Sequence, residues 1–209
     1  MSEWKFYKPE EIEQRSMEII EAELAGQNIV LPDDRKKVIK RVIHTTADFD
    51  YTHNLCFSEQ AVELAKALLR DGATIVTDTN MALSGINRRA LAAHDCKAVC
   101  FMAEPDVAEE AKARGVTRAA VSMERAAELP GRKLFAVGNA PTALIALHQM
   151  MEEERFCPDF IIGVPVGFVN VVEAKELILH SRVPHIVARG RKGGSTVAAA
   201  ICNSLLYDL

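Results

Sequence analysis

The sequence has few of the features that mark membrane, secreted or nucleic-acid-binding proteins. No apolar run approaches the ~20 residues of a membrane span, and residues 1–7 are too charged to begin a secretory signal. Its five cysteines are odd in number and lack disulfide-framework spacing, which favours a reducing compartment. The net charge of −4 argues against broad nucleic-acid binding. We therefore expect a cytoplasmic protein that binds neither nucleic acid nor membrane.

Several short motifs that identify large enzyme classes are also missing. The sequence has no P-loop, and no three-glycine dinucleotide fingerprint follows its first expected strand. It contains neither a His-Glu-x-x-His zinc motif nor a Gly-x-Ser-x-Gly nucleophile elbow. Cys96 and Cys100 lie four residues apart without a second ligand pair. We interpret these two as core thiols and predict no metal site.

What the sequence does contain is a regular alternation of short apolar runs and helical patterns. The runs span residues 73–77, 97–101, 133–137, 160–164 and 185–188. Strands that alternate with helices indicate right-handed crossovers and a parallel sheet covered on both faces. We predict an α/β fold in three layers, with a five-stranded, mostly parallel, flavodoxin-like doubly wound sheet. A length of 209 residues suits a single domain over residues 1–209.

An N-terminal helical arm is expected before this domain core. Proline and acidic residues at 9–11 favour a helix start, and Gly26 favours its end. Ser16 is the small polar residue on the otherwise apolar stripe of this helix. A serine in that position usually bonds back to its own helix.

The chain is organised around residues 41–51, where a helical pattern gives way to a histidine, two threonines and two aspartates. Threonine and aspartate are disfavoured inside helices, so the helix should end near His44. A helix carboxyl end favours a protonated imidazole, and histidine titrates near neutral pH. His44 is thus a candidate proton donor. The alternative is a histidine that merely caps a helix.

Glycine, proline and small polar residues follow four of the expected strands, and the last loop adds Arg189, Arg191 and Lys192. In doubly wound sheets, ligands gather at these carboxyl ends. Backbone amides and cations there favour an anionic ligand. These patterns leave open an enzyme or a carrier for a small polyanion.

Five motifs, in order, resemble those of the precorrin-8X methylmutase family. They are Arg-Val-Ile-His-Thr-Thr-Ala-Asp-Phe-Asp at 41–50, Thr-Asp-Thr-Asn-Met-Ala-Leu-Ser-Gly-Ile-Asn at 77–87, Gly-Asn-Ala-Pro-Thr-Ala-Leu at 138–144, Gly-Val-Pro-Val-Gly-Phe-Val at 163–169 and Gly-Arg-Lys-Gly-Gly-Ser at 190–195. The resemblance implies an isomerase of cobalamin biosynthesis. Such an enzyme moves a methyl group from C-11 to C-12 of (cobalt-)precorrin-8, giving hydrogenobyrinate or cobyrinate.

The resemblance also implies the site residues and partners. His44 would be the catalytic proton donor and acceptor, and the substrate-binding residues would be Ser16, Arg41, Thr45, Ser84, Gly85, Arg118, Arg191 and Lys192. A homodimer would hold the tetrapyrrole near the subunit interface. No cofactor is needed for a 1,5-shift, and any cobalt belongs to the substrate. The first and last motifs look closer to the cobalt-handling branch of the family.

Two other functions stay open at this point. A non-catalytic corrinoid carrier would keep the arginines but would have no use for the imidazole. A flavodoxin-like mononucleotide-binding protein would use the strand-end loops for one phosphate and would need few additional arginines.

Overall fold

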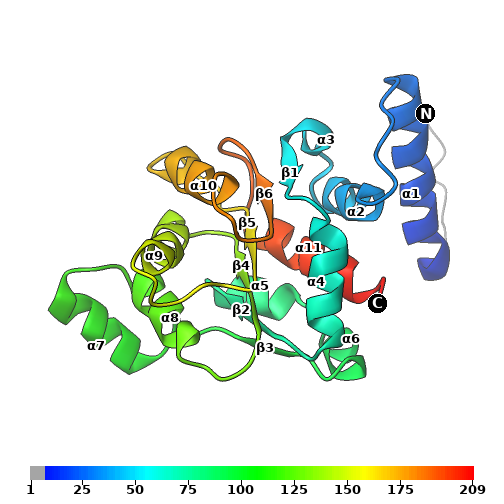
Figure 1. The fold of residues 1–209 in the computed structure, drawn as a ribbon. Helices are drawn as coiled ribbons and strands as arrows, with labels where there is room; N and C mark the ends of the chain where they lie inside the picture. The colour runs from blue at the N-terminus through cyan, green and yellow to red at the C-terminus, as the bar shows by residue number, and fades with distance from the viewer. Residues whose placement is uncertain (1–7) are drawn as a thin grey trace.

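Residues 8–209 are described by a computed structural model and form one mixed six-stranded sheet with helices on both faces (Figure 1). The order across the sheet is β1-β6-β5-β4-β2-β3. Strand β1 runs antiparallel to β6, and all the other neighbouring pairs are parallel. The strands are β1 (Leu55–Phe57), β2 (Thr74–Thr77), β3 (Lys97–Val99), β4 (Lys133–Val137), β5 (Phe160–Gly163) and β6 (His185–Ala188).

The α/β class and the mostly parallel sheet are confirmed, but the expected count of five strands is wrong. The five parallel strands lie where the apolar runs predicted them. The missing strand is β1, which has only three residues and therefore shows no alternating pattern. It forms because Leu55 to Phe57 pair with Ala188 to Ile186 at the open edge of β6.

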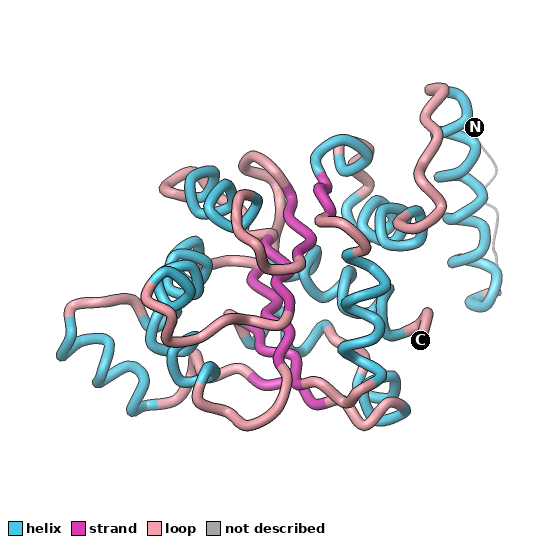
Figure 2. Tube along the Cα trace, viewed as in Figure 1, coloured by secondary structure: helices cyan, strands magenta, loops and turns pink. Residues whose placement is uncertain are grey.

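Helices cover the two faces of the sheet in separate layers (Figure 2). Alternate residues of β4 point to opposite cores: Leu134 and Ala136 pack with one group of helices, and Phe135 and Val137 with the other. The first group is α2 (Lys36–Thr46), α4 (Ala61–Arg70), α5 (Asn80–Gly85), α6 (Arg88–Ala93) and α11 (Ser195–Leu206), and the second is α8 (Arg118–Ala127), α9 (Pro141–Glu152) and α10 (Val171–Leu179), with α7 (Pro105–Arg114) outside it. A short helix α3 (Tyr51–Asn54) precedes β1.

The predicted N-terminal arm is helix α1 (Pro9–Gly26). It is the outermost element of its layer and packs against α2 (Figure 1). Ile20 and Leu24 are the buried residues of this contact. The arm is therefore joined to the sheet through the helix that carries His44.

The direction in which the chain winds reverses between β2 and β4. After β3 the chain returns past β2 to add β4 on the other side. The loops that follow β2 and β4 therefore lead to opposite faces, which is where ligands bind in such sheets. Among residues 8–209, no helix is both long enough and apolar enough to cross a membrane.

Candidate active site

A buried carboxylate joins the loops that follow β2 and β4 at the carboxyl edge of the sheet. Asp78 follows β2 directly and is 0% exposed. Its carboxylate accepts hydrogen bonds from the backbone amides of Gly138, Asn139 and Ala140, at 2.9, 2.8 and 2.7 Å. Burial raises the pKa of Asp78, and the three amide donors oppose that rise. The β2 and β4 loops are thereby locked in register.

The loop after β6 packs against these same loops. The hydroxyls of Thr79 and Ser195 are hydrogen-bonded at 2.8 Å. Gly138 permits this approach, since a Cβ there would lie 2.7 Å from the Cα of Ser195. Gly193 has φ +158°, and a Cβ on it would lie 2.0 Å from the carbonyl oxygen of Val164. Only glycines let these three backbones meet so closely.

Helix α2 delivers His44 to this edge of the sheet. The helix ends at Thr46, and Ala47 follows in the left-handed conformation with φ 52°. The hydroxyl of Thr45 donates to the carbonyl of Arg41 at 2.9 Å, and that of Thr46 donates to Val42 at 2.8 Å. Among residues 8–209, no group is hydrogen-bonded to the half-buried imidazole of His44. The amide of Ala47, which donates to the carbonyl of Ile43 at 2.7 Å, and not the histidine ring, caps the helix end.

Lys192 connects the last strand-end loop to the segment that follows His44. Its Nζ donates to the carboxylates of Asp48 and Asp50, at 2.6 Å each. The ammonium group lowers the pKa of Asp48, and the two carboxylates raise that of Lys192. The loop of residues 189–194, called the cationic loop below, therefore lies beside the end of α2, as a shared site requires.

Arg41 lies one turn before His44 and faces the carboxyl end of α11. Its guanidinium pairs with Glu13 of α1 at 2.8 Å and stacks over the ring of Tyr207 at 5.5 Å. Lys37, one turn earlier, pairs with Asp208. Helices α2 and α11 therefore run antiparallel, with Arg41 and His44 on the side of α2 that follows α11.

Ser84 and Gly85 approach α11 from its other side. The side-chain amide of Asn203 donates to the carbonyl of Gly85 at 2.9 Å. A Cβ on Gly85 would lie 2.8 Å from the Cβ of Ala199, so α5 packs closely against α11. Helix α11 thus separates α2, which carries Arg41 and His44, from α5, which carries the exposed Ser84.

Arg191 stands at the tip of the cationic loop beside an exposed aromatic ring. Its guanidinium lies 5.4 Å from the centre of the Phe168 ring, and Phe168 is 81% exposed. Val166 and Val169 of the same loop are also exposed. A cation beside a projecting apolar surface suits a ligand that is both apolar and carboxylated.

Comparison with known proteins shows the family of the chain. A profile of the precorrin-8X methylmutase family matches residues 11–208. The chain belongs to the precorrin-8X methylmutase family. It is 49% identical to a cobalt-precorrin-8 methylmutase of Salmonella typhimurium over 173 residues, covering 82% of this chain and 80% of that one. The resemblance seen in the five motifs is confirmed.

Two further members of the methylmutase family extend the comparison. A precorrin-8X methylmutase of Pseudomonas aeruginosa is 40% identical over 190 residues, covering 90% of this chain and 89% of that one. The crystal structure of precorrin-8X methylmutase from Thermus thermophilus has a TM-score of 0.83 and 36% identity, covering 94% of this chain and 96% of that one. The shared fold thus covers nearly the whole chain.

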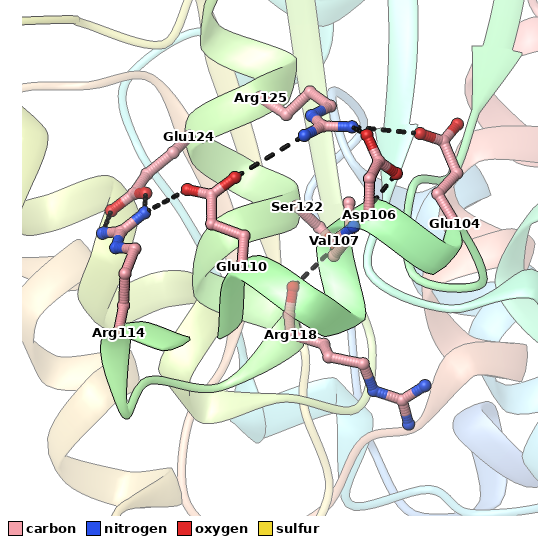
Figure 3. Close-up of polar contacts among 9 residues, drawn as sticks. All are labelled: Glu104, Asp106, Val107, Glu110, Arg114, Arg118, Ser122, Glu124 and Arg125. Atoms are coloured by element: carbon pink, nitrogen blue, oxygen red, sulfur yellow. Dashed lines mark hydrogen bonds and ion pairs between the residues drawn. The ribbon is translucent and has the colours of Figure 1, made fainter. Parts of the chain in front are cut away.

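Of the predicted methylmutase site residues, Arg118 lies apart from the others within one chain, whereas Ser16 lies one turn along α1 from Glu13, the ion-pair partner of Arg41. Ser16 lies on the α1 arm and donates its hydroxyl to the carbonyl of Ile12 at 2.8 Å, the bond expected for a serine on this stripe. Arg118 begins α8, on the opposite face of the sheet from α2. Figure 3 shows its guanidinium directed away from the neighbouring ion pairs, in which Arg114 and Arg125 bind four carboxylates.

The nearby bond between Thr117 and Thr142 at 2.8 Å places the start of α8 at the carboxyl edge of the sheet. Arg118 therefore lies at the same edge as the other predicted residues, although it lies on the far side. Among residues 8–209, no group of three or more His, Cys, Asp or Glu side chains could hold a metal ion.

Sequence reasoning missed two buried charged residues that organise this methylmutase site. Asp78 could have been noticed from its position, because it is an acidic residue directly after a buried strand. Lys175 interrupts the apolar row of α10 that contains Val171 and Ile178, at helical spacings of four and three residues. Neither signal indicates which backbone groups the side chain binds.

Proposed function

We propose that this protein is a methylmutase of cobalamin biosynthesis that moves a methyl group from C-11 to C-12 of cobalt-precorrin-8, giving cobyrinate. The observation that carries the proposal is the family match over residues 11–208, which includes the His44 helix and every loop at the carboxyl edge of the sheet. The forms of the motifs at 41–50 and 190–195 support the cobalt-containing substrate. So does the 49% identical relative that is named a cobalt-precorrin-8 methylmutase.

His44 is the proposed proton donor and acceptor. Its imidazole is half-buried and has no hydrogen-bond partner among residues 8–209, so it is available to a ligand. Protonation of the macrocycle near ring C would promote the 1,5-shift, and the imidazole would take a proton back afterwards. A positioned acid of this kind contributes roughly 10²–10⁴-fold in rate.

The cations are proposed to bind the acetate and propionate carboxylates of the macrocycle. Arg41 lies beside the carboxyl end of α11, and Arg191 and Lys192 lie in the loop that leads into its amino end. Arg41 and Lys192 are already paired with carboxylates of this chain, Glu13 and Asp48 among them. A substrate carboxylate would replace these partners, so the protein holds both cations in place before binding.

The remaining polar groups would complete the binding site. Thr45, Ser84 and the backbone of Gly85 lie on either side of α11 and are exposed. Ser16 would contact the substrate beside Arg41, and Arg118 would contact a part of it that lies farther from His44. The position of Arg118 on the far face of the sheet supports a site that a second subunit completes.

A homodimer is therefore part of the proposal. Phe168, Val169 and Met81 are more than half exposed on elements that begin at the carboxyl edge. Apolar side chains on such an edge are covered when a partner subunit and a broad macrocycle bind there. Light scattering at micromolar concentration should give twice the monomer mass, and a monomer mass would count against the shared site.

No cofactor is proposed, because the shift breaks and forms carbon–carbon bonds within one molecule and needs only proton transfer. Cobalt, where present, enters as part of the substrate. We also place the protein in the cytoplasm, which agrees with five cysteines that are all free.

The deciding experiment is incubation of the purified protein with cobalt-precorrin-8 and, separately, with metal-free precorrin-8X. Methyl migration changes the conjugation of the macrocycle, so the visible spectrum should change with time, and faster for the cobalt form. A corrinoid carrier would bind without spectral conversion. A mononucleotide-binding protein would do neither and would instead bind a nucleotide.

A further inference from the structure

A buried lysine lies beneath the cationic loop. Lys175 belongs to α10 and is 0% exposed. Its Nζ donates to the carbonyl oxygens of Gly190 and Lys192, at 2.8 Å each. These two carbonyls stand on either side of Arg191 in the chain. The lysine therefore holds the backbone immediately before and immediately after that arginine.

The carbonyl between these two is held as well. The backbone oxygen of Arg191 accepts from the amide of Gly167 at 3.2 Å. The amide of Gly194 in turn donates to Val164 at 2.8 Å. Lys175 and the amide of Gly167, which lies in the loop after β5, thus bind three successive carbonyls, those of residues 190 to 192. This leaves the Arg191 side chain directed over the Phe168 ring.

Burial of a charged lysine at this position costs desolvation free energy. Burial lowers the pKa of Lys175 to about 8, and among residues 8–209 no carboxylate pairs with its Nζ. An apolar side chain in the row between Val171 and Ile178 would avoid the cost of desolvation. What the ammonium group provides instead is two charge-assisted bonds to one loop.

We propose that Lys175 is a positioning residue of the methylmutase, which acts through the loop of residues 190–192 to direct Arg191 toward a substrate carboxylate. The inference rests on the proposed role of Arg191. Lys175 itself does not reach the substrate, because its side chain is fully covered. Its effect is to keep the guanidinium in the binding direction before the ligand arrives.

The first test needs no ligand. Amide hydrogen exchange would be measured on the full-length protein and on Lys175→Met, which keeps the length of the side chain. The matched control is Lys66→Met, because Lys66 is a buried lysine that pairs with Glu63 and Asp208 instead. Exchange should rise at Gly167 and over residues 190–194 in Lys175→Met alone. Parental exchange in that loop would overturn the inference.

A second variant covers a failure of Lys175→Met to fold. Lys175→Gln keeps two N–H donors on a shorter, neutral group, so its loop exchange should lie between those of the parent and the methionine variant. Exchange that rises across the whole of either variant, rather than in the loop, would show a general structural role and would refute positioning.

The second test is a double-mutant cycle on the affinity for cobyrinate. Lys175→Met should weaken binding roughly tenfold, as neighbouring coupled residues do. In an Arg191→Ala background the same change should have less than a twofold effect, because the side chain it directs is gone. In an Arg41→Ala background the tenfold loss should persist.

A tenfold loss that persists in Arg191→Ala would show that Lys175 does not act through Arg191. Unchanged affinity of Arg191→Ala would also overturn the inference, while the methylmutase activity could still stand. If the parent protein neither converts cobalt-precorrin-8 nor binds cobyrinate, the proposed function fails. The exchange experiment then decides alone whether Lys175 orders the loop.

Discussion

Replacing His44 by asparagine should separate catalysis from folding. The imidazole is half-buried and makes no hydrogen bond within residues 8–209, and the cap of α2 is the amide of Ala47, which donates to the carbonyl of Ile43. Loss of the ring therefore leaves no buried group unsatisfied. The free energy of unfolding should change by about 0.5 kcal/mol or less, as for surface substitutions. Asparagine cannot transfer a proton near neutral pH, so turnover should fall by roughly 10²–10⁴-fold.

The assay is the time course of the visible spectrum with cobalt-precorrin-8, alongside urea unfolding and the affinity for cobyrinate. His53→Asn is the matched control, because His53 is an exposed histidine on α3 close to the same helix end. It should keep the parental rate. A parental rate for His44→Asn would mean that the imidazole transfers no proton in the slow step. Failure of that variant to fold would make His44 part of the scaffold.

Three further predictions concern charged groups. Arg41→Ala should weaken cobyrinate binding by about 1.5–3 kcal/mol, whereas Glu13→Gln, which frees Arg41 from an exposed ion pair, should tighten it by at most about 1 kcal/mol; calorimetric titration that showed no change in either would exclude Arg41 from the site. Asp78→Ala leaves three backbone amides without their acceptor, of which that of Gly138 is buried, and should lower the free energy of unfolding by about 1–3 kcal/mol, with Asp78→Asn intermediate in urea titrations. Lys175 has its pKa lowered to about 8 in the folded protein, so its burial penalty is complete below that pH and disappears as the pH rises toward 10.5; the contribution of this group to stability should therefore increase over that window in the parent and not in Lys175→Met.

The sequence predicted the regular elements because their signals are local. The apolar runs at 133–137 and 185–188 coincide with β4 and β6, and the stop at Gly26 coincides with the end of α1. Strand β1 could not be predicted, since three residues carry no periodicity and their partner is more than 120 positions away. Phe57 has helical spacing with Ala61, Leu64 and Leu68, but it lies in β1, and the helix begins at Ala61.

Sequence reasoning named residues for the candidate site but could not indicate most of the contacts between them. The three-residue spacing of Arg41 and His44 places them on nearly the same side of one helix, and this can be predicted because a turn of helix is a local property. The pairing of Arg41 with Glu13 joins two helices, and no local pattern encodes it. The bond of Ser16 to its own helix was expected from the residue type, and it is present.

The antiparallel strand β1 also bears on how the protein stays dispersed. It covers the free side of β6, and the amide of Arg189 donates to the carbonyl of Asn54 at 2.7 Å just beyond the paired residues. Without it, β6 would offer an unpaired row of backbone groups between buried valine and isoleucine side chains. Such an edge is a template for pairing with other chains. A chain that began at Ser58 would therefore lose both His44 and β1, and we expect it to aggregate through the uncovered side of β6.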